Sequence, residues 1–579
     1  MTESSRGEEP SAWSRRGFLL TAAALAAGSQ VVLQGRAEAA AELPGFPEDV
    51  DVYRSAYRNW DGEITAVGLW ACAPGDADQV VQVVNWARQQ GWTVRARGSS
   101  HGWSPLTIPA GTEADAPVLL VDTVPGLTGL SLESTTPAAA VRAGTGVTLE
   151  TLLGFLEDRG LGLTATPAPG DLTLGGALAI DAHGTAVPAD GESRLPGHTY
   201  GSLSNLVLSL TAVVWDADSD AYVLRTFGRD DADCAALLTH LGRALITEVV
   251  LRAGANTNLR CVSRTDIPAA ELFAAPGGDS GRRTFASFLD EAGRAEAIWF
   301  AFTEFPWLKI WSVTPSKPLT SRRVTSPYNY PFSDNVPTVV ADLAGRIVSD
   351  AAWYLAPVLG NAQFTAAAVG LTATLSADIW GPSKNTLLYI KPTTLRVTAN
   401  GYAVHTSRAE VQRVVAEFTA FYRELLTTYA ARGSYPVNGS VEIRVTGLDE
   451  PSDADSTDAR APLLSALRPR ADHPEWDTAV WLDVLTLPGT ADAAAFYREL
   501  ERFLLTTYDG GHALTRVEWS KGWAYTDEAA WSDQEVIGSA VPASFDDGEG
   551  PDWEQTAGVL DRLDPHRVYD NAFLRQLFP

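Results

Sequence analysis

Apolar residues recur with the period of an α-helix in three stretches of the chain, 80–87, 149–156 and 411–425. A polar capping residue precedes each of the first two, and a glycine follows each of the last two. Short runs of β-branched and other apolar residues predict strands beside the first two helices, at 92–96 and 139–143. Helices and strands therefore alternate in the first part of the chain, as in a set of small α/β units.

The pattern changes after residue 255, where long aromatic stretches replace these short units. Residues 296–303 and 307–313 predict aromatic strands, while 316–385 are rich in proline, serine and asparagine and predict insertions between elements. The sequence Phe-Tyr-Arg-Glu-Leu occurs at 421–425 and again at 496–500, which suggests a duplicated strand–helix unit. A second domain of the α+β class is therefore expected.

The length of 579 residues exceeds the size at which one hydrophobic core keeps growing, so several domains are expected. We place them at 44–255 and 256–525, with 526–579 returning to the first domain. The hydrophobic fraction of 45% is typical of globular rather than disordered proteins. The many tryptophans and phenylalanines would suit a bulky apolar ligand, although most aromatic residues belong to cores.

Charge and cysteine content exclude several classes of partner and site. A net charge of -27 argues against nucleic acid and against anionic membranes, because basic patches carry that kind of binding. Three cysteines without a CxxC pair make no disulfide framework, and a structural zinc site is not expected. We therefore predict no metal site.

The N-terminus has the features of an export signal. Arg15 and Arg16 precede an apolar run that is too short to span a bilayer, and small residues at 37–39 offer a cleavage site. Paired arginines before such a run are typical of the twin-arginine pathway, which carries folded proteins. We expect residues 1–40 to be removed and the protein to be secreted.

The loop after the strand at 92–96 has the most informative chemistry in the chain. Its residues 98–102 are small apart from His101, so backbone N–H groups could close on an anion there. A histidine that projects from such a loop can act as a nucleophile toward an electrophilic cofactor. We predict a cofactor site at this loop.

A second glycine-rich segment follows at 167–185. A helix that opens at Leu174, Gly175 and Gly176 would present free backbone N–H groups to a phosphate. Glycines this dense are more often simple turn residues, so the segment is weak evidence alone. Two such loops in one α/β region favour a dinucleotide site, although no GxGxxG motif of the Rossmann type opens a first βαβ unit.

A polar pair stands out in the strand predicted at 440–446. Glu442 and Arg444 point to one face of that strand, where arginine could stabilise an alkoxide and the carboxylate could accept a proton. The alternative is an ion pair that faces solvent. Glu518 and Lys521 form a second pair among tryptophans, either buried and functional or on the surface.

Several of these segments resemble a known enzyme class. The loop 97–102 and the segments 169–176 and 182–185 are similar to the vanillyl-alcohol-oxidase class of FAD enzymes. Within that class, the leader, the length and the segments 307–311, 328–334 and 569–573 resemble the bacterial type II cholesterol oxidases, which bind flavin covalently.

The resemblance implies a fold of the α+β class: a two-subdomain FAD-binding domain of the vanillyl-alcohol-oxidase type, and a substrate (cap) domain with a large antiparallel sheet. It also implies that His101 carries the flavin through its 8α-methyl group. The residues that it places around FAD are Arg97, Gly98, Ser99, Ser100, His101, Gly102, Ser104, Pro169, Gly170, Thr173, Gly175, Gly176, Ile180, His183, Gly184, Ser202, Asn205 and Asn571.

The resemblance assigns roles to the polar residues as well. Arg444 would bind the 3β-hydroxyl of a sterol, and Glu442 would orient Arg444 or take the proton. Glu518 and Lys521 match a later Glu and Lys of the family. A further family glutamate, which pairs with the arginine, matches Glu296 ahead of Glu304, and Glu296 is our hypothesis for the isomerisation of the product. A family asparagine falls at Asp483.

Two departures from the family pattern bear on the cofactor. The usual Gly-x-Gly-His-Ser loop reads Gly-Ser-Ser-His-Gly here, so the phosphate contacts can differ. No cysteine lies between Cys72 and Cys234, so attachment through His101 alone is expected.

The expected partners are a sterol and O2, with transient contact with sterol-bearing membranes and no nucleic acid, and the expected state is a monomer. One alternative is an alditol or aldonolactone oxidase, although an aromatic-rich domain favours a sterol over a sugar. Another is an exported sterol-binding protein without catalysis.

Overall fold

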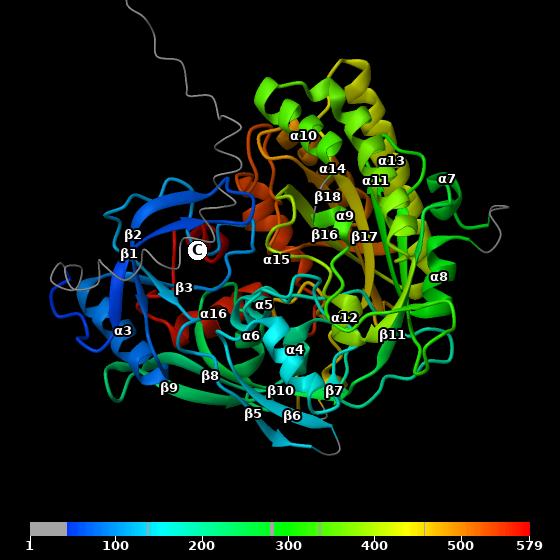
Figure 1. The fold of residues 1–579 in the computed structure, drawn as a ribbon. Coiled ribbons are helices and arrows are strands. Elements are labelled where there is room, and N and C mark those ends of the chain that lie inside the picture. The colour runs from blue at the N-terminus through cyan, green and yellow to red at the C-terminus, as the bar shows by residue number, and fades with distance from the viewer. Residues whose placement is uncertain (1–42, 136–137, 278–282, 335–336, 455, 457) are drawn as a thin grey trace, which may run out of the picture.

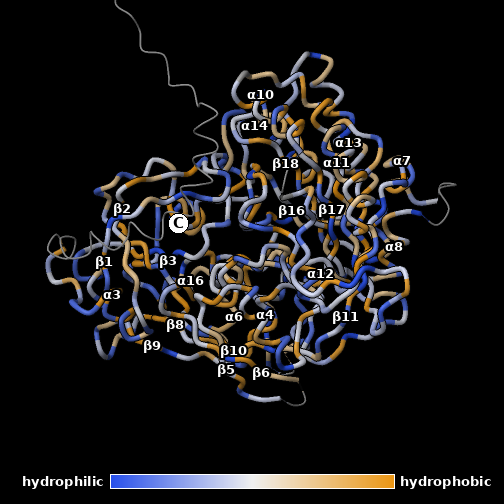
Figure 2. Tube along the Cα trace, in the orientation of Figure 1, coloured by the Kyte–Doolittle hydropathy of each residue, from blue (hydrophilic) through white to orange (hydrophobic). Residues whose placement is uncertain are grey.

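Three β-sheets organise the molecule, two in the first domain and one in the second (Figure 1). The computed structural model describes residues 43–135, 138–277, 283–334, 337–454, 456 and 458–579. The export signal predicted for residues 1–40 lies outside the described residues. Hydrophobic stretches gather inside the molecule and polar stretches at its margins (Figure 2), so each sheet is part of a core.

The first sheet has the strand order β1-β2-β4-β3, and only β1 runs antiparallel to its neighbour. Helix α3 packs beside it, with Asp76 accepting a hydrogen bond from the Gln79 amide as its cap. The helix predicted at 80–87 is therefore confirmed. The elements are β1 (Asp51–Arg58), β2 (Thr65–Ala73), α3 (Ala77–Gln90), β3 (Thr93–Arg97) and β4 (Val118–Asp122).

The second sheet is antiparallel and has the order β5-β6-β10-β8-β9, with β7 paired to β10. Three short helices accompany it, α4, α5 and α6, and of these α5 lies within the second glycine-rich segment. The elements are β5 (Leu130–Ser134), β6 (Ala139–Gly144), α4 (Leu149–Glu157), β7 (Leu161–Gly162), α5 (Leu174–Ala179), β8 (Val207–Asp216), β9 (Ala221–Gly228), α6 (Cys234–Leu238) and β10 (Leu245–Ala255).

The second domain is built on a large sheet with the order β14-β15-β11-β13-β12-β17-β18-β16-β19. All its pairs are antiparallel except β14 with β15, which confirms the predicted fold class. The strands are β11 (Asn258–Arg264), β12 (Arg294–Phe300), β13 (Trp307–Val313), β14 (Arg322–Arg323), β15 (Asp378–Pro382), β16 (Thr398–Thr406), β17 (Ser440–Gly447), β18 (Thr478–Thr486) and β19 (Ala513–Val517).

Helices cover both faces of this sheet. Helices α8, α13 and α14 pack on the face that carries Val441, Ile443 and Val445. Helix α11 packs on the other face, beside Trp307 and Trp311. The helices are α7 (Ala269–Leu272), α8 (Phe285–Ala292), α9 (Pro331–Asp334), α10 (Thr338–Asp350), α11 (Ala356–Ala373), α12 (Ser383–Leu387), α13 (Val411–Ala431), α14 (Ala493–Thr507), α15 (Val541–Ser544), α16 (Trp553–Leu563) and α17 (Leu574–Leu577).

The prediction that 316–385 are only insertions between elements is wrong. This stretch contains the helices α10 and α11 and the strand β15, which pairs with β11. In α11, alanines, glycines and other apolar residues lie on all sides of the helix, so its sequence shows no polar face to reveal the helical period.

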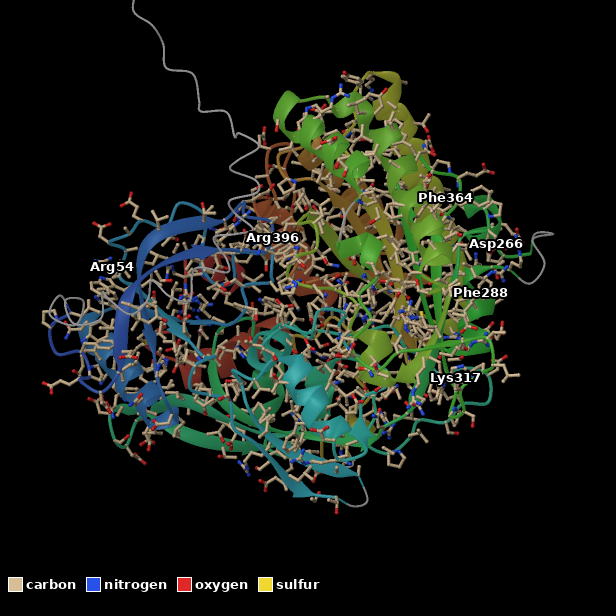
Figure 3. All side chains as sticks on the ribbon, in the orientation of Figure 1. Arg54, Asp266, Phe288, Lys317, Phe364 and Arg396 are labelled. Carbon is tan, nitrogen blue, oxygen red and sulfur yellow. The ribbon has the colours of Figure 1, made fainter. Side chains whose placement is uncertain are left out.

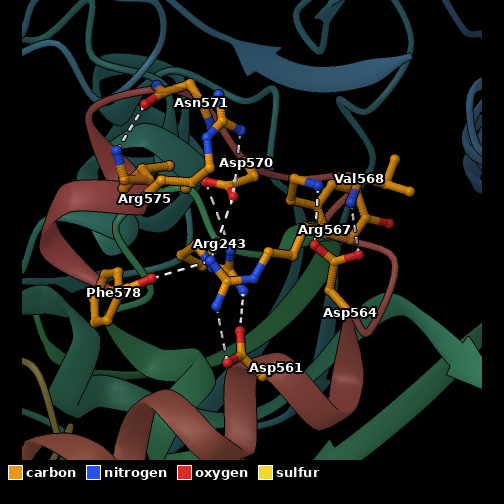
Figure 4. Close-up of polar contacts among 12 residues, drawn as sticks. Arg243, Asp561, Asp564, Arg567, Val568, Asp570, Asn571, Arg575 and Phe578 are labelled. Carbon is orange, nitrogen blue, oxygen red and sulfur yellow. Dashed lines mark hydrogen bonds and ion pairs between the residues drawn. The ribbon is translucent and has the colours of Figure 1, made fainter. Parts of the chain in front are cut away.

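The C-terminal segment returns to the first domain, where Val568 and Tyr569 join the core around α3. The Val94 amide donates a hydrogen bond of 2.7 Å to the Val568 carbonyl. Close by, the buried Arg243 lies between Asp561 and Asp570 (Figure 4), at 2.7 and 3.7 Å. Residues far apart in sequence are thus joined beside the sheet that leads to His101.

Three negative findings apply to the residues that the structure describes. None of their helices is both long and apolar enough to cross a membrane. They contain no cluster of His, Cys, Asp or Glu side chains suited to a metal ion. The cysteines Cys72, Cys234 and Cys261 are all buried and form no disulfide.

Candidate active site

A cavity of about 530 Å³ lies where the two predicted loops meet the large sheet of the second domain. Most of the predicted site residues line it. Those from the first domain are Gly98, Ser99, Ser100, His101, Gly102, Ser104, Pro169, Thr173, Gly175, Gly176, Ile180, His183 and Gly184. Those from the second domain are Glu296, Glu442, Arg444, Glu518 and Lys521.

His101 lies in the loop that follows β3. Its ring stacks on Trp60, with the ring centres 3.7 Å apart. The Nδ1 atom is buried and has no hydrogen-bond partner among the described residues, although Asp171 Oδ2 lies 3.7 Å away. Arg396 of the second domain donates a hydrogen bond of 3.1 Å to the Trp60 carbonyl, and its guanidinium lies 5.0 Å from the centre of the Trp60 ring.

The two glycine-rich loops are in direct contact. A Cβ atom added to Gly98 would lie 2.0 Å from Thr173 Oγ1, so only glycine allows this approach. The Ser99 hydroxyl donates to the Asp171 carbonyl. The amides of Trp103 and Ser104 donate to the Ser520 carbonyl at 2.8 and 3.1 Å, which ties the His101 loop to the segment that carries Lys521.

The prediction of free N–H groups at the start of the helix at 174 is wrong for two of its three residues. The Leu174 amide donates to the Val147 carbonyl at 2.8 Å, and the Gly175 amide donates to the Thr145 carbonyl at 2.9 Å. These amides tie α5 to the loop between β6 and α4. A Cβ atom on Gly175 would lie 2.8 Å from that of Thr145, so this glycine permits close packing.

Five predicted cofactor residues do not line the cavity in the part of the chain that the structure describes. Arg97 pairs with Asp122, and the Gly170 carbonyl accepts from the Glu150 amide. The other three are Ser202, which donates to Asp449, Asn205, which donates to the Glu450 carbonyl, and Asn571, which donates to the carbonyls of Pro105 and Leu106. These contacts hold neighbouring segments in place, and the assignment of these five residues to the cofactor stays a prediction.

Arg444 is the centre of a charged cluster in the cavity wall. The alternation along β17 puts it on the same face as Glu442, as predicted, and that face borders the cavity rather than solvent. Its Nε donates to Glu296 at 2.8 Å, and Nη1 donates to Asp483 at 2.8 Å. Nη2 donates to Glu442. Burial opposes the charge, yet these carboxylates raise the pKa of Arg444 well above its usual value.

Lys521 and Asp483 extend the cluster toward the His101 loop. Lys521 Nζ lies 3.1 Å from Glu518 Oε1 and also donates to Asp483. Of the two interpretations of the Glu518–Lys521 pair, the buried one is therefore correct. Burial, followed by the charge of Glu518, raises the pKa of Asp483 to about 6. Burial disfavours the charge on Lys521, but Asp483 and Glu518 outweigh it and raise its pKa.

Glu296 rather than Glu304 belongs to this cluster. Glu296 is almost fully buried on β12, whereas Glu304 is exposed in the bend after that strand. Besides Arg444, Glu296 accepts a hydrogen bond of 2.7 Å from the Tyr389 hydroxyl and lies 3.4 Å from Lys309 Nζ. The sequence analysis missed Tyr389 and Lys309. The register of β12 against β13, which sets Glu296 opposite Lys309, could have revealed the lysine.

His183 stacks on Trp481, with the ring centres 3.5 Å apart. Its Nδ1 lies 2.9 Å from the Gly184 carbonyl, and burial lowers its pKa to about 3. The imidazole is therefore neutral near pH 7, with Nδ1 as the donor and Nε2 as an acceptor. Trp481 was not among the predicted residues.

The rest of the second-domain wall is apolar. Among its residues are Ile298, Phe300, Trp307, Phe332 and Val340. The cavity thus combines a charged end, formed by Arg444 and its carboxylates, with an extended hydrophobic part. Such a site suits a bulky apolar molecule that carries a hydroxyl group at one end.

Comparisons with known proteins give the same picture. A family model described as "Cholesterol oxidase, substrate-binding" matches residues 258–579, and an "FAD binding domain" model matches residues 70–218. Among curated proteins, none matches the chain.

Solved structures match over most of the chain. A structure titled "Solvent-stable cholesterol oxidase" is 54% identical, with a TM-score of 0.91, and the match covers 93% of this chain and 99% of that one. Cholesterol oxidase from B. sterolicum is 44% identical, with a TM-score of 0.90 and the same coverage. A histidine-to-alanine variant of the Brevibacterium sterolicum enzyme matches equally well. The chain belongs to the cholesterol oxidase family, in which it joins an FAD-binding domain to a cholesterol-oxidase substrate-binding domain.

Proposed function

We propose that this protein oxidises the 3β-hydroxyl group of cholesterol and related sterols with O2, releases H2O2, and isomerises the product to the 4-en-3-one. The observation that carries the proposal is Arg444, which is held by three carboxylates at the charged end of a largely apolar cavity. The same cavity contains the His101 loop, so a sterol and the cofactor would meet in one space.

The residues of the first domain fit FAD. The loops at 98–104 and 169–184 contact each other through small residues and leave space in front of them. Bound FAD would accept a hydride from the alcohol carbon and pass two electrons to O2. We infer that FAD is attached through His101 alone, because its Nδ1 is buried and unbonded in the described structure and none of the three cysteines lines the cavity.

Arg444 and Glu442 supply the acid–base chemistry of the alcohol. The guanidinium of Arg444 stays charged and can stabilise the alkoxide that develops as the hydroxyl loses its proton. Glu442 accepts that proton, since its side chain is one-fifth exposed toward the cavity and bonds to Arg444 through a single oxygen. The ion pair thus orients the base beside the group that binds the oxygen.

For the isomerisation, the contacts favour Glu442 over our earlier hypothesis of Glu296. Both oxygens of Glu296 are engaged, one by Arg444 and the other by Tyr389 and Lys309. A carboxylate that relays a proton between two carbons of the sterol needs a free oxygen near the substrate. Glu442 meets this requirement in the observed arrangement, so we assign the proton relay to it.

We further propose that the protein is exported by the twin-arginine pathway, acts as a monomer and takes sterol from membranes. The outer sides of α10 and α11 support the last point, because Val339, Val348, Val358 and Val369 are each at least half exposed there. The inner sides of the same helices line the cavity through Val340 and neighbouring residues. Such apolar patches often mark contact with a membrane or another apolar surface.

Two measurements test the proposal. Purified holoenzyme should release peroxide and form a conjugated enone with cholesterol, and neither with xylitol. Turnover of xylitol alone would favour an alditol oxidase, and flavin-loaded protein that is silent with both would favour sterol binding only. After acid precipitation, the wild type and a control His566→Ala should keep yellow colour in the pellet, whereas His101→Ala should lose it. Colour in the His101→Ala pellet would refute attachment through His101.

A further inference from the structure

Lys309 is a fully buried lysine enclosed by aromatic rings. Its Nζ lies 2.9 Å from the centre of the Tyr389 ring and 4.7 and 5.2 Å from those of Trp311 and Tyr330. Nζ has no hydrogen-bond partner within the described ranges. The ring faces attract an ammonium group, whereas burial lowers the pKa of Lys309, against the opposing effect of Glu296. If this position served packing alone, an apolar residue of similar volume such as methionine would stabilise the fold at least as well.

The strand register connects Lys309 to the cavity. Glu296 lies directly opposite Lys309 across β12 and β13, and directly opposite Arg444 across β12 and β17. The three side chains therefore form a row of alternating charge across neighbouring strands. Lys309 itself is not among the described residues that line the cavity, so it can act on the substrate only indirectly, through lining residues such as Glu296.

Glu296 is held from both sides of this row. On one side Arg444 bonds Oε1, and on the other Tyr389 and Lys309 face Oε2. Burial is the strongest influence on Glu296 and opposes its ionisation. Even so, its pKa lies below the ordinary value, because Arg444, then Lys309, and the hydrogen bond from Tyr389 favour the carboxylate.

We propose that Lys309 is a positioning residue that keeps Glu296 ionised and thereby holds Arg444 in its orientation toward the sterol hydroxyl. The charged and titratable groups around Glu296 are Lys309 from β13, Arg444 and Glu442 from β17, Tyr389 from the segment after α12, and the Cys261 thiol from β11. Removal of Lys309 leaves Glu296 with Arg444 as its remaining cation. Glu296 then takes up a proton at a higher pH, and Arg444 loses one of its three anchoring charges.

The test compares Lys309→Met with the wild type and with Lys317→Met, which alters an exposed lysine on the loop after β13 (Figure 3). The acid limb of kcat for cholesterol should move up by about 1 to 3 pH units in Lys309→Met, because an opposite charge within a few ångströms shifts a pKa by that amount. At pH 8 its kcat should stay within about threefold of the wild type. In a Glu296→Gln background, the same lysine substitution should leave the pH profile unchanged.

If the acid limb of kcat stays in place in Lys309→Met, or if kcat falls by the same factor at every pH, Lys309 does not have this role. Flavin content and melting temperature show that each variant is folded. If the wild type itself fails to oxidise cholesterol, the proposed function fails, and the role of Lys309 is then tested by the pH dependence of the melting temperature.

Because the Glu296 pKa is depressed, its ionisation stabilises the fold above the unfolded pKa and ceases to do so as pH falls. On acidification the melting temperature of the wild type should therefore fall by more than that of Lys309→Met. An equal fall in both proteins would refute the inference.

Discussion

Asp483→Asn should stabilise the protein above pH 6. Asp483 is fully buried and uses one oxygen, Oδ2, to accept from both Arg444 and Lys521. Its Oδ1 has no hydrogen-bond partner in the part of the chain described, and neither does Glu518 Oε2. An asparagine can keep its oxygen at the Oδ2 position and turn its amide toward Glu518. Arg444 and Lys521 would each still face a carboxylate.

The size of the effect follows from the pKa of Asp483, which rises from an ordinary 3.8 to about 6 in the fold. A difference of roughly 2 pKa units corresponds to about 3 kcal/mol. Well below pH 3.8 the group is protonated in both states and costs nothing. As pH rises from there to pH 6 the unfolded chain ionises first, so the fold loses stability, and above pH 6 the full cost remains. The asparagine variant should gain up to about this amount at pH 7.5 and less than about 1 kcal/mol at pH 4.

Thermal unfolding of the holoenzyme at pH 4 and pH 7.5 measures this difference. Asp527→Asn is a matched control, because its carboxylate is largely exposed and pairs with Arg498 on the surface. The Asp483→Asn variant should melt several degrees above the wild type at pH 7.5 only. A variant that melts lower at pH 7.5, or whose difference is the same at both pH values, would refute the argument that burial of this charge is unfavourable.

Three further predictions concern catalysis, the loop that carries His101, and the outer helices. Arg444→Lys should lower kcat for cholesterol by about 10²- to 10³-fold in a peroxide-release assay, because a lysine cannot bond three carboxylates and the alkoxide together; an unchanged kcat would contradict this. Asn571→Ala removes hydrogen bonds of 3.1 Å to the carbonyls of Pro105 and Leu106 and should cost about 1 to 3 kcal/mol of stability, measured by unfolding. The double variant Val339→Asp, Val358→Asp should slow oxidation of sterol in vesicles several-fold but leave detergent-solubilised sterol unaffected, whereas Leu319→Asp should affect neither; equal slowing on both substrates would argue against membrane contact.

The parts of the site that follow from local sequence could be predicted. A strand has a period of two, so Glu442 and Arg444 must share a face wherever that strand lies. The small residues around His101 likewise predicted a loop that could close on an anion, and residues 98–102 line the cavity. These inferences need only a few neighbouring residues.

The partners of Arg444 could not be predicted from local sequence. Glu296 and Asp483 come from separate strands, and the order β12-β17-β18 that brings them beside Arg444 is not encoded in any local pattern. Tyr389 lies between α12 and β16, in a segment for which the sequence pattern predicted no element. Likewise, α11 has apolar residues on all sides, because one side faces the cavity while another carries the exposed Val358 and Val369.

The same lack of local signal applies to Ser202 and Asn205, which the family resemblance, rather than their local pattern, assigned to the cofactor. Small polar residues in a loop beside a glycine-rich segment can equally bind a ligand or a neighbouring turn. Here they donate to Asp449 and to the carbonyl of Glu450, in the turn after β17. The pattern within residues 200–205 is the same in either case, so only the tertiary contact distinguishes the two.

The return of the C-terminal segment imposes an order on biosynthesis. Arg95, just before the His101 loop, donates to the carbonyl of Tyr569, 474 positions later in the chain. Asn571 binds the carbonyl of Pro105 across 466 positions. A nascent chain therefore cannot complete its first domain until the second has been synthesised and residues 568–571 have left the ribosome. Stable capture of a dinucleotide by that domain is expected only after residues 568–571 have emerged and docked beside the His101 loop.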